Sequence, residues 1–375
     1  MPTAATAGGG EPVRIGACIS GHGFGHATRT IAVLQALGRC MNIEVVLVTT
    51  APAGLFAESL TMPYRIHAHA VDVGLVQHNA LVEDIPATLE SLATFQRQEK
   101  DQVDRIAQLL AGCRLVLCDI APLGIAAARQ AGVPSLLMEN FTWDWIYAAY
   151  ADQWPGLQTH VEALATLFDR ADYRIQTQPV CRLADCDCRV EPVARPLRQP
   201  ERLRQRLFLE PGQHLIVLTM GGLGHDRLPL PQLLQRPDVV FALPGWSREN
   251  EFTGNLRFLG REDSWYHPDL LAAADLVVGK LGYSTVAEAY QAGTPYAYVP
   301  RQDFAESAVL AAFVDTHLPS WRIEPDQWEC GRWLAALPPL PVQRSIVPHG
   351  AAKGADQTAD WLTKLLLGSE PSTSR

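Results

Sequence analysis

Two histidines stand in a glycine-rich loop near the start of the chain. His22 and His26 lie in Gly-His-Gly-Phe-Gly-His-Ala-Thr-Arg, residues 21–29. An apolar run at 13–19 comes before this loop, and a helical pattern of apolar residues follows it. Histidine can take up or release a proton near neutral pH, and glycines such as Gly23 let the backbone approach a ligand closely. The loop therefore predicts proton-transfer chemistry at the carboxyl end of the first strand.

A dinucleotide-binding loop is the alternative interpretation of these glycines. Gly21, Gly23 and Gly25 follow a strand pattern, as in dinucleotide-binding folds. Such folds place an acidic residue at the end of the second strand to hold the ribose. Here the second strand, 43–48, ends in two threonines. The missing acid favours chemistry over NAD or FAD binding.

A second glycine-rich stretch, 279–288, follows a buried strand in the other half of the chain. Lys280 brings a positive charge, and Ser284 and Thr285 are expected to cap the next helix and face an anion. One turn later, Glu288 is placed to accept hydrogen bonds from ribose hydroxyls. The pattern predicts a nucleotide-diphosphate site without a Walker motif or an evident Mg²⁺ ligand set; an ordinary strand-to-helix turn is the alternative.

Elements that position these groups alternate between strands and helices, which indicates parallel sheets covered by helices on both faces. The expected strands are 13–19, 43–48, 115–118, 135–138, 173–175, 214–219, 239–243, 276–278 and 296–299. A proline-rich linker at 191–200 divides them. We expect an α/β protein with two Rossmann-like domains, 1–195 and 196–350. Residues 351–375 form a final helix that either closes its own domain or crosses back to the first.

Composition limits the class of partner. The chain has 375 residues, a net charge of -9 and no Lys/Arg-rich run, which argues against nucleic acid. It has no apolar stretch near the ~20 residues that span a bilayer, and no signal-peptide pattern, so we expect a cytoplasmic protein. Eight cysteines are too few for a disulfide framework, and the spacing of Cys181, Cys186 and Cys188 does not match a zinc site. No metal ligand set is predicted.

Four motifs carry a resemblance to a known class. The Gly-His loop and the Gly-Tyr-Ser-Thr unit together resemble GT-B glycosyltransferases, including the MurG-like and plant UDP-glycosyltransferase groups. More closely, the chain is similar to the N-terminal glycosyltransferase-like region of plant L-arabinokinases. The matching segments are 21–29, 71–77, 140–147 and 279–285. No ATP loop of the sugar-kinase type is present in the sequence, so kinase activity is not implied.

The resemblance assigns the catalytic pair. It places His26 as the base that deprotonates the acceptor hydroxyl and Asp119 as the acid that orients the imidazole. This chemistry is sound in itself, because a carboxylate behind an imidazole fixes its tautomer and stabilises the charged ring. His22 is the rival base. The remaining acceptor-side residues are predicted to be Gly23, Gln77, Trp143 and Asp144, although core packing explains the tryptophan equally well.

The resemblance also implies a donor side, which holds a nucleotide sugar. The phosphates are expected to meet Lys280, Ser284, Thr285 and the backbone of Gly221 and Gly222, with Glu288 on the ribose and Asp303 and Glu306 on the donor sugar. In UDP-glycosyltransferases a histidine occupies the position of Lys280. That difference leaves the identity of the nucleotide open, with a UDP-sugar favoured.

Together these residues predict a metal-independent, inverting glycosyltransferase of the hexosyl- or pentosyltransferase class (EC 2.4). It would use a nucleotide sugar as co-substrate and no cofactor. The two domains would face each other across a cleft. Two alternatives share this fold: a nucleotide-sugar epimerase or hydrolase, and a non-catalytic nucleotide-sugar sensor. The sequence leaves the donor sugar, the acceptor and the oligomeric state open.

Overall fold

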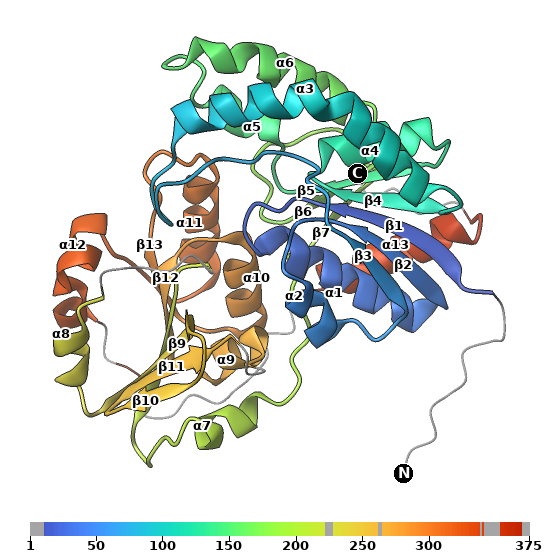
Figure 1. Cartoon of the computed structure of the whole chain (residues 1–375). Coiled ribbons are helices and arrows are strands. Elements are labelled where there is room, and N and C mark those ends of the chain that lie inside the picture. Colours follow the sequence, from blue (N-terminus) through green and yellow to red (C-terminus); the bar gives the residue numbers. More distant parts are fainter. Residues whose placement is uncertain (1–10, 222–227, 262–264, 338–339, 341–352, 370–375) are drawn as a thin grey trace. The chain divides into compact units, whose positions relative to one another are not determined.

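A computed structural model describes residues 11–221, 228–261, 265–337, 340 and 353–369. They form two compact units, which are treated separately below (Figure 1). Unit 1 holds 11–76, 84–193 and 353–369, and unit 2 holds 77–83 and the described residues from 194 to 340. Each unit is therefore assembled from segments that are distant in the sequence.

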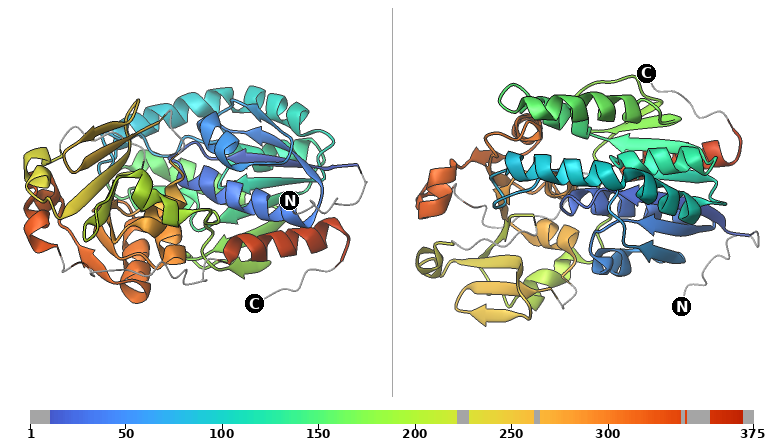
Figure 2. Two further views of the ribbon diagram at one scale, coloured as in Figure 1. Left: turned by 90° about the horizontal axis from the view of Figure 1, so that it is seen from below. Right: turned by 45° about the horizontal axis from the view of Figure 1, so that its top comes forward.

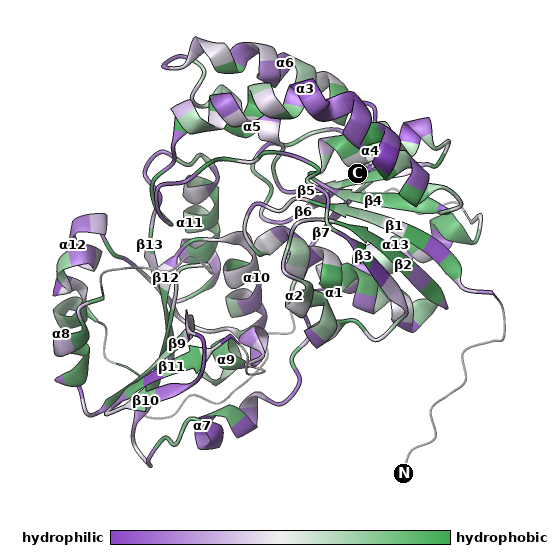
Figure 3. Cartoon of the chain, in the orientation of Figure 1, coloured by the Kyte–Doolittle hydropathy of each residue, from purple (hydrophilic) through white to green (hydrophobic). Residues whose placement is uncertain are grey.

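Unit 1 is built on a parallel sheet of seven strands in the order β3-β2-β1-β4-β5-β6-β7. The strands are β1 (Val13–Ile19), β2 (Ile43–Val48), β3 (Tyr64–His67), β4 (Leu115–Asp119), β5 (Ser135–Glu139), β6 (Tyr173–Thr177) and β7 (Cys188–Val190). The residues of β1, β2, β4 and β5 are mostly buried, whereas β3 has none that is buried. In Figure 3, β4 is largely green and β3 carries purple. Strands buried on both faces read as continuous apolar runs, which explains why the main ones were predictable.

Helices cover both faces of this sheet. One face carries α3 (Ile85–Leu110), α4 (Pro122–Gln130), α5 (Trp143–Ala148) and α6 (Gln158–Phe168), and the other carries α1 (Gly25–Cys40), α2 (Ala53–Ser59) and α13 (Gly354–Leu366) (Figure 1). A short 3₁₀ turn, Pro155–Leu157, precedes α6. No helix in the described ranges has the length and apolar composition needed to cross a bilayer.

Helix α13 lies against α1, as the left view of Figure 2 shows. Its buried face, which includes Trp361 and Leu362, joins the apolar cluster between α1 and the sheet. A Cβ atom on Gly354 would lie 2.0 Å from the carbonyl oxygen of Glu191, so the start of the helix fits closely on the backbone after β7. The last described helix is thus part of the core of unit 1.

Unit 2 contains a second sheet of seven strands, in the order β10-β11-β9-β8-β12-β13-β14. Among the strand pairs that the structure describes in this sheet, β10–β11 is antiparallel and the others are parallel. The strands are β8 (His214–Thr219), β9 (Val239–Ser247), β10 (Glu251–Thr253), β11 (Leu256–Gly260), β12 (Leu276–Lys280), β13 (Tyr296–Val299) and β14 (Ser320–Arg322). The helices are α7 (Leu203–Arg206), α8 (Leu230–Leu234), α9 (His267–Ala273), α10 (Tyr283–Ala292), α11 (Glu306–His317) and α12 (Pro325–Cys330), with 3₁₀ turns at Pro200–Arg202 and Arg332–Ala336.

In each unit the strand order reverses beside the first strand, and open α/β sheets bind ligands at the carboxyl edge of such a point. In unit 1 the reversal lies between β1 and β4, where Ile19 pairs with Asp119. In unit 2 it lies between β8 and β12, where Thr219 pairs with Gly279. A Cβ on Gly279 would lie 1.7 Å from the Thr219 carbonyl oxygen, so only glycine fits there. Both glycine-rich loops of the sequence lead away from these points.

The structure differs from the sequence predictions in three places. The predicted loop at 21–29 is too long, because α1 begins at Gly25 and includes both His26 and Arg29. Short strands β3, β7, β10, β11 and β14 were not predicted, since three to five residues carry little periodicity. Cys188, which lies outside the expected strands, is the first residue of β7.

Candidate active site

His26 and Asp119 meet at the carboxyl edge of the unit 1 sheet. His26 lies in the first turn of α1, and Asp119 is the last residue of β4. The His26 Nδ1 atom is 2.8 Å from Asp119 Oδ1. Asp119 is fully buried, and His26 is 7% exposed. An ionised carboxylate only accepts hydrogen bonds, so Nδ1 carries the proton and Nε2 is left as the basic nitrogen.

Further donors hold the Asp119 carboxylate in place. Arg29 Nε and Thr30 Oγ1 each donate to Asp119 Oδ2 at 3.0 Å, and Arg29 Nη2 donates to Oδ1. Arg29 Nη1 also donates to Asn140 Oδ1 at 2.7 Å and to Thr177 Oγ1 at 3.2 Å. The guanidinium therefore ties α1 to the carboxyl ends of three strands.

This network sets the ionisation of Asp119. Burial raises the pKa of the carboxyl group, but the Arg29 charge and the hydrogen bonds from His26 and Arg29 outweigh burial and lower the pKa below its ordinary value. Asp119 is therefore a carboxylate at neutral pH.

His22 has a different hydrogen-bonding pattern. The backbone N–H of Leu75 donates to its Nδ1 atom at 3.4 Å, so the ring proton lies on Nε2. Gly74 has a φ of +67°, and a Cβ there would lie 2.7 Å from the His22 ring. The edge of the ring meets Trp143, with centroids 5.1 Å apart. In this tautomer His22 offers a donor to the site and His26 offers an acceptor.

Trp143 lies between the two histidines and a buried acid. Its Nε1 donates to Asp72 Oδ2 at 2.7 Å, and its ring stacks on Tyr147. Burial raises the pKa of Asp72, although the hydrogen bonds from Ser20 and Trp143 oppose it. Asp72 and Trp143 also line a cavity of about 100 Å³ beneath α3 and α6. Trp143 is thus a core residue that also shapes the site.

The remaining predicted acceptor-side residues are spread over the structure. Gly23 is exposed, has a φ of +74° and faces open space. Asp144 is buried and points to Arg182 Nη2, 2.8 Å away, so it is not grouped with the dyad. Gln77 pairs with Glu83 in an isolated antiparallel bridge that belongs to unit 2.

On the donor side, Lys280 and Gly221 lie together at the reversal point of unit 2. A Cβ on Gly221, which has a φ of +73°, would lie 2.6 Å from Lys280 Cε. Burial, and next the charge of Arg301, lower the pKa of Lys280 to about 8, while Glu306 and Glu83 act in the opposite direction. Arg301 itself is ion-paired with Glu83. The Lys280 ammonium is therefore a poorly hydrated positive charge at the predicted phosphate site.

Helix α10 begins directly after Lys280. The prediction that Ser284 and Thr285 cap this helix is wrong. The N-cap is Gly282, and Ser284 and Thr285 lie within the first turn. Gly282 makes no side-chain capping hydrogen bond. The N-terminus of a helix favours negative charge, so a phosphate is suited to this position.

Glu288 is buried on α10 and already has two protein partners. Arg195 Nε donates to Oε1 at 3.1 Å, and His267 Nδ1 lies 2.6 Å from Oε2. Burial raises the pKa of Glu288, but the Arg195 charge and the His267 contact outweigh burial and lower it. A ribose contact by Glu288 stays a prediction. In such a contact the carboxylate oxygens of Glu288 would accept from the ribose hydroxyls as well as from Arg195 and His267.

The other donor-side residues are less closely grouped. Glu306 is the buried first residue of α11 and acts on the charge of Lys280, whereas Asp303 is exposed. Gly222 lies outside the described residues.

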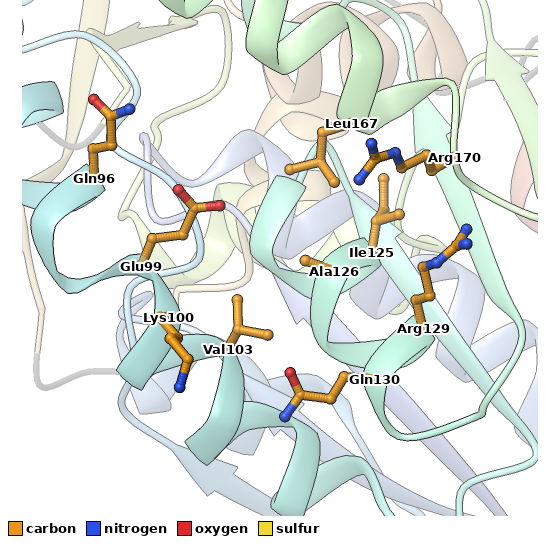
Figure 4. A pocket seen from close by; sticks show the side chains of 10 residues that line it. All are labelled: Gln96, Glu99, Lys100, Val103, Ile125, Ala126, Arg129, Gln130, Leu167 and Arg170. Atoms are coloured by element: carbon orange, nitrogen blue, oxygen red, sulfur yellow. The ribbon is translucent and has the colours of Figure 1, made fainter.

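A separate open groove of about 540 Å³ lies between α3, α4 and α6, lined by Lys100, Arg129 and Arg170 among others (Figure 4). It contains none of the predicted site residues. Within the described ranges, no three His, Cys, Asp or Glu side chains, Cys181, Cys186 and Cys188 included, come together as a metal site requires.

Sequence reasoning missed several residues of the site. Arg29 lies three positions after His26 in a motif that was itself recognised, and helical spacing would have placed both on one face. Asn140 and Asp72 also lie in recognised motifs, at the end of β5 and after β3. No sequence pattern pointed to Arg195 or His267 as neighbours of Glu288. Arg195 lies in the linker and His267 begins a short helix, and neither segment has a periodicity that predicts this contact.

Solved structures with this fold include glycosyltransferases and an epimerase. The calicheamicin glycosyltransferase CalG4 aligns with a TM-score of 0.59 and 18% identity, over 96% of this chain and 99% of that one. The glycosyltransferase SnogD from Streptomyces nogalater aligns with a TM-score of 0.55 and 18% identity, over 95% of this chain and 99% of that one. A putative UDP-N-acetylglucosamine 2-epimerase from Listeria monocytogenes aligns with a TM-score of 0.56 and 13% identity, over 97% of this chain and 100% of that one. These likenesses confirm the expected GT-B fold.

Sequence comparison narrows the family. L-arabinokinase of Arabidopsis thaliana is 28% identical over 369 residues, which is 93% of this chain and 34% of that protein. The chain therefore spans about a third of this curated relative. The family model described as glycosyl transferase family 1 matches residues 13–338. Because that match covers both units, the chain belongs to glycosyl transferase family 1.

Proposed function

We propose that this protein transfers a hexosyl or pentosyl group from a nucleotide-diphosphate donor to an acceptor hydroxyl, by an inverting and metal-independent reaction. The observation that carries the proposal is the buried His26–Asp119 pair at the carboxyl edge of unit 1. Its tautomer leaves Nε2 of His26 to accept the proton of the acceptor.

The reaction is a single displacement. The acceptor oxygen forms a bond to the anomeric carbon as the bond to the diphosphate oxygen breaks, and the hydroxyl proton passes to His26 Nε2. One displacement at this carbon inverts its configuration. Asp119 stabilises the imidazolium that forms. His22 is less suited to this role, because the Leu75 N–H occupies its Nδ1 atom and its other nitrogen carries the proton.

The departing diphosphate needs positive charge. Lys280 and the N-terminus of α10 supply it in this proposal, together with the nearby backbone of Gly221. Ser284 and Thr285 lie in the first turn and add hydroxyls, and Glu288 would reach the ribose. Asp303 and Glu306 remain the proposed contacts to the donor sugar. A UDP-sugar is the favoured donor.

The test separates chemistry from donor binding. Donors are first chosen by thermal shift with UDP-glucose, UDP-N-acetylglucosamine and UDP-arabinose, the last because the curated relative is named for L-arabinose. We expect His26→Ala to lower kcat about 10²–10⁴-fold, the usual contribution of a general base, while the Kd for UDP is kept. His22→Ala is the matched control and should lose far less. Undiminished turnover in His26→Ala contradicts the proposal.

The fold alone does not separate transfer from epimerisation, since a putative 2-epimerase shares it. Incubating the protein with a donor and no acceptor distinguishes them. Rapid release of free sugar or formation of an epimer would replace transfer with hydrolysis or epimerisation. Donor binding without turnover across a broad acceptor panel would indicate a sensor.

A further inference from the structure

Arg29 is the most buried charged group beside the dyad. Its side chain is 1% exposed and lies one helical turn after His26 on α1. Burying a guanidinium is costly unless every donor finds an acceptor. Here the acceptors are Asp119, Asn140 and Thr177, from the carboxyl ends of β4, β5 and β6. The guanidinium is therefore held by acceptors from three strands.

The guanidinium shares an atom with the base. Asp119 Oδ1 accepts from both His26 Nδ1 and Arg29 Nη2, and Nη2 lies only 3.3 Å from His26 Nδ1. The negative charge of the carboxylate behind His26 is thus partly offset by a permanent positive charge before the ring takes up a proton. A protonated imidazole would meet that charge at close range in a dry interior, where charges interact more strongly than in water.

We propose that Arg29 is a positioning residue that keeps His26 in its neutral, proton-accepting form. A lone buried aspartate would attract a proton to the ring and hold it there as an ion pair. With Arg29 in place, Asp119 orients the ring without trapping the proton. In the part of the chain that the structure describes, the charged groups that contact His26 are Asp119 on β4 and Arg29 on α1, and Asp72 after β3 interacts with it electrostatically.

The test follows the titration of the His26 ring by NMR, with His26→Gln used to assign its signal. Arg29→Gln removes the charge and keeps hydrogen-bonding capacity. We expect the titration midpoint to rise by about 1–3 pH units, the usual effect of a charge within a few Å. Thr30→Val is the matched control, because it removes a neutral donor to the same carboxylate. It should leave the midpoint near the wild-type value, as should Arg29→Lys, which retains the charge.

A second variant covers the possibility that Arg29→Gln does not fold. Asp119→Asn leaves the Arg29 charge without its partner, so we expect the His26 midpoint to fall below that of the wild type, and to rise again when Arg29→Gln is added. If Arg29 only supports the structure, adding Arg29→Gln to Asp119→Asn leaves the midpoint unchanged. That result, or an unmoved midpoint in folded Arg29→Gln, overturns the proposal.

A kinetic readout rests on the proposed function. The acid limb of the kcat/KM profile should move to higher pH in Arg29→Gln, and it should not move in Thr30→Val. The NMR titration needs no turnover, so the two failures are distinguishable. If the NMR midpoint shifts in Arg29→Gln but the wild-type protein transfers no sugar, the role of Arg29 is supported and only the proposed function is refuted.

Discussion

The two units contain the same three chemical groups in different settings. In unit 1, His26 and Arg29 both contact the buried carboxylate of Asp119. In unit 2, His267 and Arg195 both contact the buried carboxylate of Glu288. In both cases the histidine uses Nδ1 and the arginine uses Nε.

The difference between them lies in exposure and in the source of the arginine. The His26 side chain is 9% exposed and that of His267 is 24%. Arg29 comes from the same helix as its histidine, whereas Arg195 comes from the linker and also lies over the Tyr266 ring. A closed histidine suits a proton transfer from which water is excluded, and a more open one suits contact with a ligand. In the proposed function, the same set of three side chains serves two roles according to its surroundings.

The largest expected effect is on stability. Asp119→Ala leaves the Arg29 charge buried without its partner, which should cost about 3–5 kcal/mol. Glu288→Ala should cost less, because Asp119 additionally accepts a hydrogen bond from Thr30. Differential scanning calorimetry measures both, with Thr30→Val as a control that loses about 1 kcal/mol. Equal losses in the two alanine variants would show that the settings do not differ.

The second prediction separates the two histidines. His267→Ala should weaken UDP binding roughly tenfold, or about 1.4 kcal/mol, while kcat falls less than it does in His26→Ala. The reason is that His267 Nδ1 lies 2.6 Å from Oε2 of Glu288, the residue predicted to bind the ribose. Isothermal titration calorimetry gives the Kd, and initial rates give kcat. If His267→Ala loses kcat and keeps its Kd, the two roles are reversed.

How far these pairs were predictable depends on what positions them. His26 and Asp119 follow strands of one parallel sheet, so their meeting could be expected from the order of elements. The contact of Arg29 with this pair was also predictable from the sequence. It was missed because the start of α1 was placed too late, since Gly25 at the first helical position gives a weak start signal. The contact of Arg195 with Glu288 was not predictable, since a linker has no periodicity from which its path could be inferred.

A third prediction compares two glycines, each with positive φ and each against a site residue. Gly74→Ala drives a Cβ into the stiff His22 ring, and Gly221→Ala drives one into the flexible end of Lys280. We expect Gly74→Ala to lose about 1 kcal/mol or slightly more. Gly221→Ala should lose less, because the lysine chain can move aside. Chemical denaturation measures both, and the reverse order would contradict this account.

The smallest expected effect concerns pH. The pKa of Lys280 is lowered to about 8, so its charge is present below pH 8 and lost above it. UDP binding should therefore weaken roughly threefold between pH 7 and pH 9.5, a change of under 1 kcal/mol. The linked effect on folding has the opposite sign: the unfolded chain binds the proton up to about pH 10.5, so stability from this group rises between pH 8 and 10.5.

Lys280→Arg is the matched control for this pH effect, because arginine stays charged over the whole range. Its UDP affinity should not change with pH. An equal decline in wild type and Lys280→Arg would assign the effect to another group.

The place of α13 determines when unit 1 can be completed during protein synthesis. This helix packs on α1, which carries His26, yet it leaves the ribosome only after all of unit 2. The nascent residues 11–193 must therefore wait, with the apolar face of α1 uncovered, until α13 has been synthesised. A chaperone that binds apolar helices would find its target there, and a stalled ribosome would leave α1 exposed.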